Sequence, residues 1–188
     1  MKKLIYPALI ATAITTSAFK VATSNKWTVK EDNYTVKFIS KKGKEFSGIF
    51  KGLKTDIQFD EANLSSSKIS ASIDATTVNT GNGMRNKHAA QALGADMYPT
   101  VKFEATSVNK LANGYEAEGK LTIKDVTKDI KLPFTFTKTA DGGVFEGKFA
   151  VVPVEYHVDK KGTPELLEIE LNVPVTKWVG NTPLYKQP

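Results

Sequence analysis

Two pairs of glutamates have the spacing that comes nearest to a catalytic arrangement. Glu116 and Glu118 stand two positions apart, and Glu168 and Glu170 repeat that spacing. On a β-strand such residues share one face and lie roughly 7 Å apart, a separation that paired carboxylates in glycoside hydrolases also use. Both pairs fall on the polar face of their segment, where no cleft would raise the pKa of a general acid. We therefore predict no catalytic residue.

The two histidines and the absence of cysteine limit the metal, redox and acid–base sites that the chain could form. The chain has two histidines, His88 and His157, and no cysteine. Disulfides, thiolate zinc sites and iron–sulfur ligation are therefore excluded, and we predict no metal and no cofactor. His157 is interpreted as a loop residue. Three interpretations stay open for His88, which lies beside Arg85 and Lys87: a solvated side chain, a contact to the polar group of a ligand, or an acid–base residue of an enzyme.

The net charge of +6 does not by itself indicate nucleic-acid binding. The 26 basic side chains include one arginine, Arg85, whereas recognition of phosphate and guanine relies on the bidentate guanidinium group. The lysines alternate with Glu, Asp and Thr along extended segments, as the solvated face of a sheet does. We therefore predict no nucleic-acid partner.

The first residues have the pattern of a secretory signal peptide. A basic start, Met1–Lys3, precedes the largely apolar residues 4–13 and the small residues 15–18. The apolar run is well short of the roughly 20 residues that a membrane-spanning helix needs. We predict a signal peptide over residues 1–18, with cleavage after Ala13 as the alternative, and a single mature domain over residues 19–188. The protein is then expected to be periplasmic or secreted and not membrane-spanning.

The rest of the chain alternates apolar and polar residues, as half-buried strands do. The alternating segments are residues 27–29, 34–38, 69–77, 101–107, 115–123, 130–136, 145–151 and 169–175, and residues 46–50 and 53–59 are expected to form a further hairpin. Strands with one apolar face must pack on something, and no helix is long enough to cover them. We therefore predict an all-β fold, a single closed antiparallel barrel of about eight strands. One short helix is expected near residues 86–93, ending before Gly94.

The residues that would face the barrel interior alternate bulky aromatic side chains with small ones. No charged residue falls on the inner face of the five segments between residues 69 and 151. A barrel of this size either holds one ligand or is filled by its own side chains. An apolar, elongated guest fits such a lining, but a dry core in which large residues pack against small ones fits it equally well.

Several of these segments also resemble a known family. The most specific are residues 98–103 and residues 119–128, followed by Leu132-Pro133-Phe134, and Trp27-Thr28-Val29-Lys30 resembles an opening strand. On these residues the chain resembles the YceI-like family, whose members are exported, lipocalin-like barrels associated with polyisoprenoid lipids. The sequence departs from that pattern in the predicted helix, at Asp125 and over residues 152–156.

The resemblance implies that the barrel sequesters or carries an isoprenoid or a similar fatty amphiphile and binds no metal. Two alternatives stay open: an enzyme acting on a small hydrophobic substrate in the same cavity, and a ligand-free extracytoplasmic interaction module. The barrel is expected to be a monomer or a homodimer. The side chains expected to contact a ligand are Phe38, Phe59, Ala71, Ile73, Ala75, Arg85, His88, Phe103, Ala105, Tyr115, Ala117, Leu121, Phe134, Phe136 and Phe149.

Overall fold

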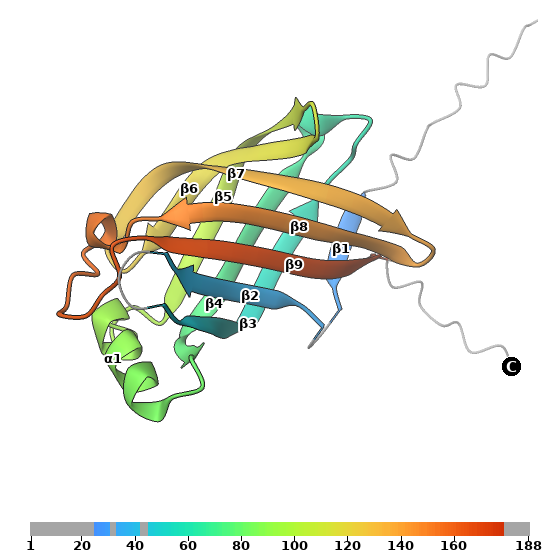
Figure 1. Ribbon diagram of the computed structural model, residues 1–188. Helices are drawn as coiled ribbons and strands as arrows, with labels where there is room; N and C mark the ends of the chain where they lie inside the picture. The colour runs from blue at the N-terminus through green and yellow to red at the C-terminus, as the bar shows by residue number, and fades with distance from the viewer. Residues whose placement is uncertain (1–24, 31–32, 42–44, 179–188) are drawn as a thin grey trace, which may run out of the picture.

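A computed structural model describes residues 25–30, 33–41 and 45–178, so the predicted signal peptide lies outside the described residues. Strands dominate this part of the chain (Figure 1). They are β1 (Lys26–Val29), β2 (Thr35–Ser40), β3 (Ser47–Gln58), β4 (Lys68–Asn79), β5 (Thr100–Leu111), β6 (Gly114–Ile123), β7 (Val126–Thr139), β8 (Gly142–Val151) and β9 (Leu167–Lys177). An α-helix, α1 (Gly83–Leu93), and two single-turn helices, η1 (Leu64–Ser66) and η2 (Pro153–Tyr156), complete the described elements.

The strands from β2 to β9 close into the predicted barrel. Each pairs antiparallel with the next along the chain, and β9 pairs with β2 to complete the ring. Closure leaves no edge strand among these eight and gives each apolar face a common interior. The prediction of an all-β, antiparallel, eight-stranded barrel with one short helix is thereby confirmed.

The ninth strand, β1, shares its position in the barrel wall with β2. Trp27 in β1 stands opposite Ile57 of β3 and Lys177 of β9, and β2 lies between the same two strands farther along. Between the two short strands, the backbone N–H of Leu53 donates to the Tyr34 hydroxyl at 3.0 Å. A side chain thus supplies one of the hydrogen bonds that the interrupted ladder cannot make.

The hairpin predicted within residues 46–59 is wrong, because these residues form the single strand β3. The alternation does change phase within β3. Phe50 and Leu53 both face inward, although they are three positions apart and regular alternation would place them on opposite faces. A β-bulge at Gly52, where φ is +69°, produces the change, and the pairing with β4 shifts register at the same place. An extra residue in a strand reverses the alternation as a turn would, so the two are hard to distinguish in the sequence.

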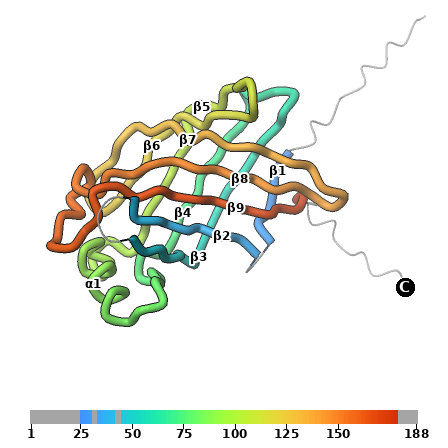
Figure 2. The backbone as a smooth tube through the Cα atoms, viewed as in Figure 1, coloured from blue at the N-terminus to red at the C-terminus, as the bar shows by residue number. Residues whose placement is uncertain are grey.

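Helix α1 begins earlier than residue 86, the predicted start. The side chain of Asn82 caps it by accepting a hydrogen bond from the backbone N–H of Arg85 at 2.9 Å. The helix ends at Gly94, as predicted, in the left-handed conformation with φ of +60°. The Oδ1 atom of Asn86 accepts two hydrogen bonds of 2.7 Å from Thr80, which attach the helix to the end of β4. Figure 2 shows α1 at the same end of the barrel as the segment between β8 and β9.

Aromatic side chains close the opposite end of the barrel. Phe59, of which 2% is exposed, lies at their centre, and its ring centroid is 5.0–5.6 Å from those of Tyr115, Phe134, Phe136 and Phe145. The indole N–H of Trp27 donates to the Phe59 carbonyl at 3.0 Å. This cluster, named the aromatic floor below, fills one half of the barrel with side chains.

The bulge in β3 can be tested with a matched pair of glycine substitutions. Gly52 and Gly81 both have positive φ, but an added Cβ at Gly52 would lie 2.9 Å from the Cβ of Asp74, whereas one at Gly81 would meet nothing within 4 Å. The left-handed conformation alone costs an alanine about 1–2 kcal/mol. We expect Gly81→Ala to lower the free energy of unfolding by about 1 kcal/mol, and Gly52→Ala to lower it by more than about 2 kcal/mol, both measured by urea denaturation. Equal losses would show that the contact with Asp74 has no effect.

Candidate functional site

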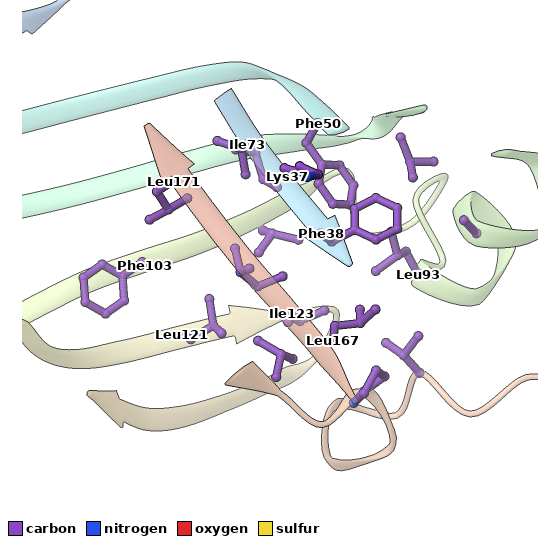
Figure 3. A pocket seen from close by; sticks show the side chains of 18 of the residues that line it. Lys37, Phe38, Phe50, Ile73, Leu93, Phe103, Leu121, Ile123, Leu167 and Leu171 are labelled. Atoms are coloured by element: carbon purple, nitrogen blue, oxygen red, sulfur yellow. The ribbon is translucent and has the colours of Figure 1, made fainter. Parts of the chain in front are cut away.

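The half of the barrel next to α1 is hollow. It contains a cavity of about 750 Å³, which is within the range of small-molecule binding sites. All eight barrel strands line it, together with α1 and residues of the segment between β8 and β9. Figure 3 shows Phe103 and Leu171 at one end of this space and Phe38 and Leu93 toward the other. The barrel is therefore neither a solid core nor an open tube, but a cup with an aromatic floor.

The wall of the cavity is apolar, and polar groups gather at its mouth. Leu53, Ile73, Leu121 and other aliphatic or aromatic side chains form the wall. The polar residues that α1, its capping residue and the segment after β8 contribute to the lining are Asn82, Arg85, His88, Gln91, Lys160, Lys161 and Thr163. Because the two kinds of group are separated along the barrel axis, the site matches a molecule with a long apolar part and a polar end.

Two lysines on strands also border the cavity, but their charges are neutralised by neighbouring carboxylates. The ammonium group of Lys37 lies 3.3 Å from Glu170, and that of Lys102 lies 2.8 Å from Glu104. They therefore do not place an unpaired charge against the apolar wall.

Most residues predicted to contact a ligand are brought together around this cavity. They are Phe38, Ala71, Ile73, Arg85, His88, Phe103, Ala117, Leu121, Phe134 and Phe149. They come from β2, β4, β5, β6, β7, β8 and α1, so closure of the barrel and the placement of the helix assemble them. Their contact with a ligand stays a prediction.

The remaining five lie outside the cavity lining. Phe59, Tyr115 and Phe136 belong to the aromatic floor. The alternation of their strands correctly predicts that they face the barrel interior. They lie nearer than the cavity to the end of the barrel that is opposite to α1. The hydroxyl of Tyr115 donates to Glu61 at 2.8 Å.

The two other residues outside the lining are alanines at irregular points of the wall. Ala75 is fully buried where the pairing of β4 with β3 shifts register, and its N–H donates to the Pro99 carbonyl at 2.8 Å. Ala105 precedes a bulge in β5, opposite Gly119. Its backbone approaches so closely that a Cβ on Gly119 would lie 2.8 Å from the Ala105 Cα atom.

The list of candidate site residues misses a substantial part of the lining. On β9, Leu167, Ile169 and Leu171 face the cavity, and their alternation was a usable signal. Leu93 of α1 and the lysine pair Lys160-Lys161 also line it. Nothing in their local sequence indicates this, because only the return of a distant segment to the mouth places them there.

The glutamate pairs lie on the outer surface and are neutralised by lysines. Lys131 lies 3.3 Å from Glu116 and 2.8 Å from Glu118, and the hydrogen bond from Lys131 is the main cause that lowers the pKa of Glu118. A lowered pKa favours a permanent carboxylate, whereas a general acid needs a raised one.

The second glutamate pair has the same environment. Lys148 lies 2.9 Å from Glu168 and 3.2 Å from Glu170, and its hydrogen bonds are the main cause that lowers the pKa of both carboxyls. Both glutamate pairs therefore act as cross-strand ion pairs of the barrel exterior.

The two histidines also lie near the mouth but do not meet. His88 is an exposed residue of α1 that borders the cavity. His157 follows η2 in a left-handed conformation, with Nδ1 3.3 Å from the carboxylate of Asp125. Within the described part of the chain, no three His, Asp or Glu side chains converge as metal ligands would, and no helix has the length and apolar character to cross a membrane.

An eight-stranded antiparallel barrel with an internal apolar cavity and a mouth at one end defines the class of lipocalin-like barrels. Residues 27–178 match the family model of the YceI-like domain, and the chain belongs to this family. Protein YceI of Salmonella arizonae is 29% identical over 136 residues, which cover 68% of this chain and 71% of that protein.

Two solved structures share the fold. BcnA of Burkholderia cenocepacia is 22% identical with a TM-score of 0.73, over 80% of this chain and 100% of that chain. A polyisoprenoid binding domain from Saccharophagus degradans, implicated in plant cell wall breakdown, is 14% identical with a TM-score of 0.62, over 81% of this chain and 98% of that chain. At these identities the likeness shows a common fold.

Proposed function

We propose that this protein binds one elongated, apolar amphiphile of the isoprenoid or fatty class in the barrel cavity and releases it chemically unchanged. The observation that carries the proposal is the apolar cavity of about 750 Å³ that leads from the aromatic floor to a polar mouth. Burial of each methylene group in such a space contributes about 0.8 kcal/mol. The polyisoprenoid binding of the Saccharophagus relative supports the same ligand class.

We further propose that binding takes place outside the cytoplasm. The basic start, the apolar segment and the small residues within positions 1–18 support export to a periplasm or to the exterior. A carrier for a poorly soluble amphiphile is useful in such an aqueous compartment, because the hydrophobic effect drives free amphiphile out of water.

Native mass spectrometry of protein purified from its source tests the function. We expect an apolar compound to co-purify and the stripped protein to take up added prenyl alcohols. Because each buried methylene contributes about 0.8 kcal/mol, affinity should rise about fourfold per added methylene and level off once the cavity is full.

Other outcomes of this experiment would favour the alternatives. Repeated absence of a bound compound, with no uptake of any prenyl alcohol, would support an interaction module. Conversion of a bound compound to a new mass, abolished in His88→Ala, would support an enzyme.

A further inference from the structure

The mouth of the cavity holds the only arginine of the chain. Of the 26 basic side chains in the sequence, 25 are lysines and one is Arg85. Arg85 lies in the first turn of α1 and lines the cavity. Arginine and lysine differ in what they recognise, because the planar guanidinium presents five N–H donors in a fixed fork that fits a phosphate or carboxylate. An arginine at this position can therefore bind an anionic acceptor that enters the mouth.

No group of the described chain occupies the donors of Arg85. Its guanidinium carbon lies 4.9 Å from the ring centroid of Phe46, so the aromatic face holds the group in place without using its N–H bonds. Its hydrogen bond to Asn82 is made by the backbone N–H. No carboxylate within residues 25–30, 33–41 and 45–178 forms an ion pair with it, whereas Lys131 and Lys148 each contact two carboxylates.

Two more positive charges border the same mouth. Lys160 and Lys161 line the cavity from the segment after β8 and, within the described residues, also lack an ion pair. One acidic residue, Glu146 of β8, lines the cavity, and it is exposed and accepts a hydrogen bond from the Asn172 side chain at 3.0 Å. The acidic side chains of the segments around the mouth do not line the cavity; they are Glu45, Asp96, Asp125, Glu155, Asp159 and Glu165. Among them, Asp125 lies 3.3 Å from Nδ1 of His157, and Glu155 lies 2.9 Å from the ammonium group of Lys128. The electrostatic balance at the entrance to the cavity is therefore positive.

We propose that the ligand carries an anionic head group, a phosphate or a carboxylate, and that Arg85 binds it with support from Lys160 and Lys161. This proposal rests on the proposed function, because it assumes that an apolar chain occupies the cavity below. The apolar chain of the ligand supplies most of the affinity, and its head group supplies the selectivity. A neutral alcohol of equal length forms no charged hydrogen bonds with the guanidinium group. Charge-assisted hydrogen bonds of this kind correspond to about tenfold or more in affinity.

Three ligands with one chain test the proposal: farnesyl phosphate, farnesoate and farnesol, titrated into the stripped protein by calorimetry at low salt. We expect at least one of the two anions to bind about tenfold tighter than farnesol. That preference should shrink as the salt concentration rises, because the mouth is open to solvent. Preference for one anion over the other identifies the head group.

Two substitutions on α1 distinguish recognition by the guanidinium group of Arg85 from the effect of any positive charge on the helix. Arg85→Lys keeps the charge and should reduce the anion preference, measured as the ratio of anion affinity to farnesol affinity, several-fold. Lys87→Gln is the matched control, because Lys87 is exposed on the same helix and does not line the cavity, so the anion preference should persist. Circular dichroism verifies that each variant is folded.

The result that would overturn the proposal is equal affinity of the wild-type protein for all three ligands, or an anion preference that survives Arg85→Gln. Either result leaves the proposed function intact as long as farnesol binds. Failure of all three ligands to bind would instead contradict the proposed function.

Discussion

Replacing Ala71 with tryptophan is expected to abolish most ligand binding while leaving the barrel folded. Ala71 lies in the middle of the cavity wall, opposite Thr55 of β3 and Phe103 of β5, and its methyl group is only partly buried because it faces the empty space. An indole at this position would take the volume of about four methylenes of the ligand, each contributing about 0.8 kcal/mol. Affinity for farnesol should fall on the order of 100-fold, as measured by calorimetry on the stripped protein.

The neighbouring residue provides the control for this substitution. Ser70 lies next to Ala71 on β4, does not line the cavity, and pairs across strands with Asp56 and Glu104. Ser70→Trp adds the same side chain on the outer face and should bind farnesol as the wild type does. Ala71 is preferred over Ala117 for this test, because Ala117 is only 2% exposed and a tryptophan there would collide with the core. Unchanged binding by folded Ala71→Trp would contradict the placement of the ligand in the cavity.

Replacing Phe59 with alanine is expected to cause the largest loss of stability of any substitution considered. The ring is almost completely buried and contacts four other aromatic rings of the floor. Removing a buried phenylalanine costs about 3–5 kcal/mol, since transfer free energy and packing are both lost. We expect the free energy of unfolding in urea to fall by about 4 kcal/mol.

Phe149 provides a contrasting substitution in the hollow half of the barrel. Its ring is half-buried and borders the cavity, so it already lacks neighbours on one side. Phe149→Ala should lower the free energy of unfolding by only about 1–2 kcal/mol, and should weaken farnesol binding because the ligand loses a wall contact. If both phenylalanines proved equally important for stability, the division into a packed floor and a hollow half would be wrong.

This division also explains why aromatic residues with the same alternation have different roles. Phe59, Tyr115 and Phe136 pack against one another, whereas Phe38 and Phe149 border empty volume. Small residues such as Ala71 create that volume, because nothing else in the described wall extends to fill it. A stable floor and a hollow upper half allow the barrel to keep its shape while its mouth admits a ligand.

Local patterns of the sequence predict most of the strands, their inward faces and the closed barrel. Period-two alternation predicted β4 to β9 with shifts of a few residues at their ends, and Gly94 marked the end of the helix. These predictions succeed because alternation, turn residues and helix caps are local properties. They fail where two different local structures produce the same sequence pattern. At Gly52 a β-bulge reverses the alternation in the way that a turn would.

The division of the inward residues between the aromatic floor and the cavity lining depends on the tertiary structure. Alternation fixes the face of a strand that a side chain occupies, but its height along the barrel axis depends on how each strand is offset against its neighbours. That offset is set by pairing between segments far apart in the chain, such as Phe38 of β2 with Ile169 of β9. The same long-range closure brings Lys160 and Lys161 to the cavity mouth that Arg85 also lines, so the polar end of the site exists only in the folded barrel.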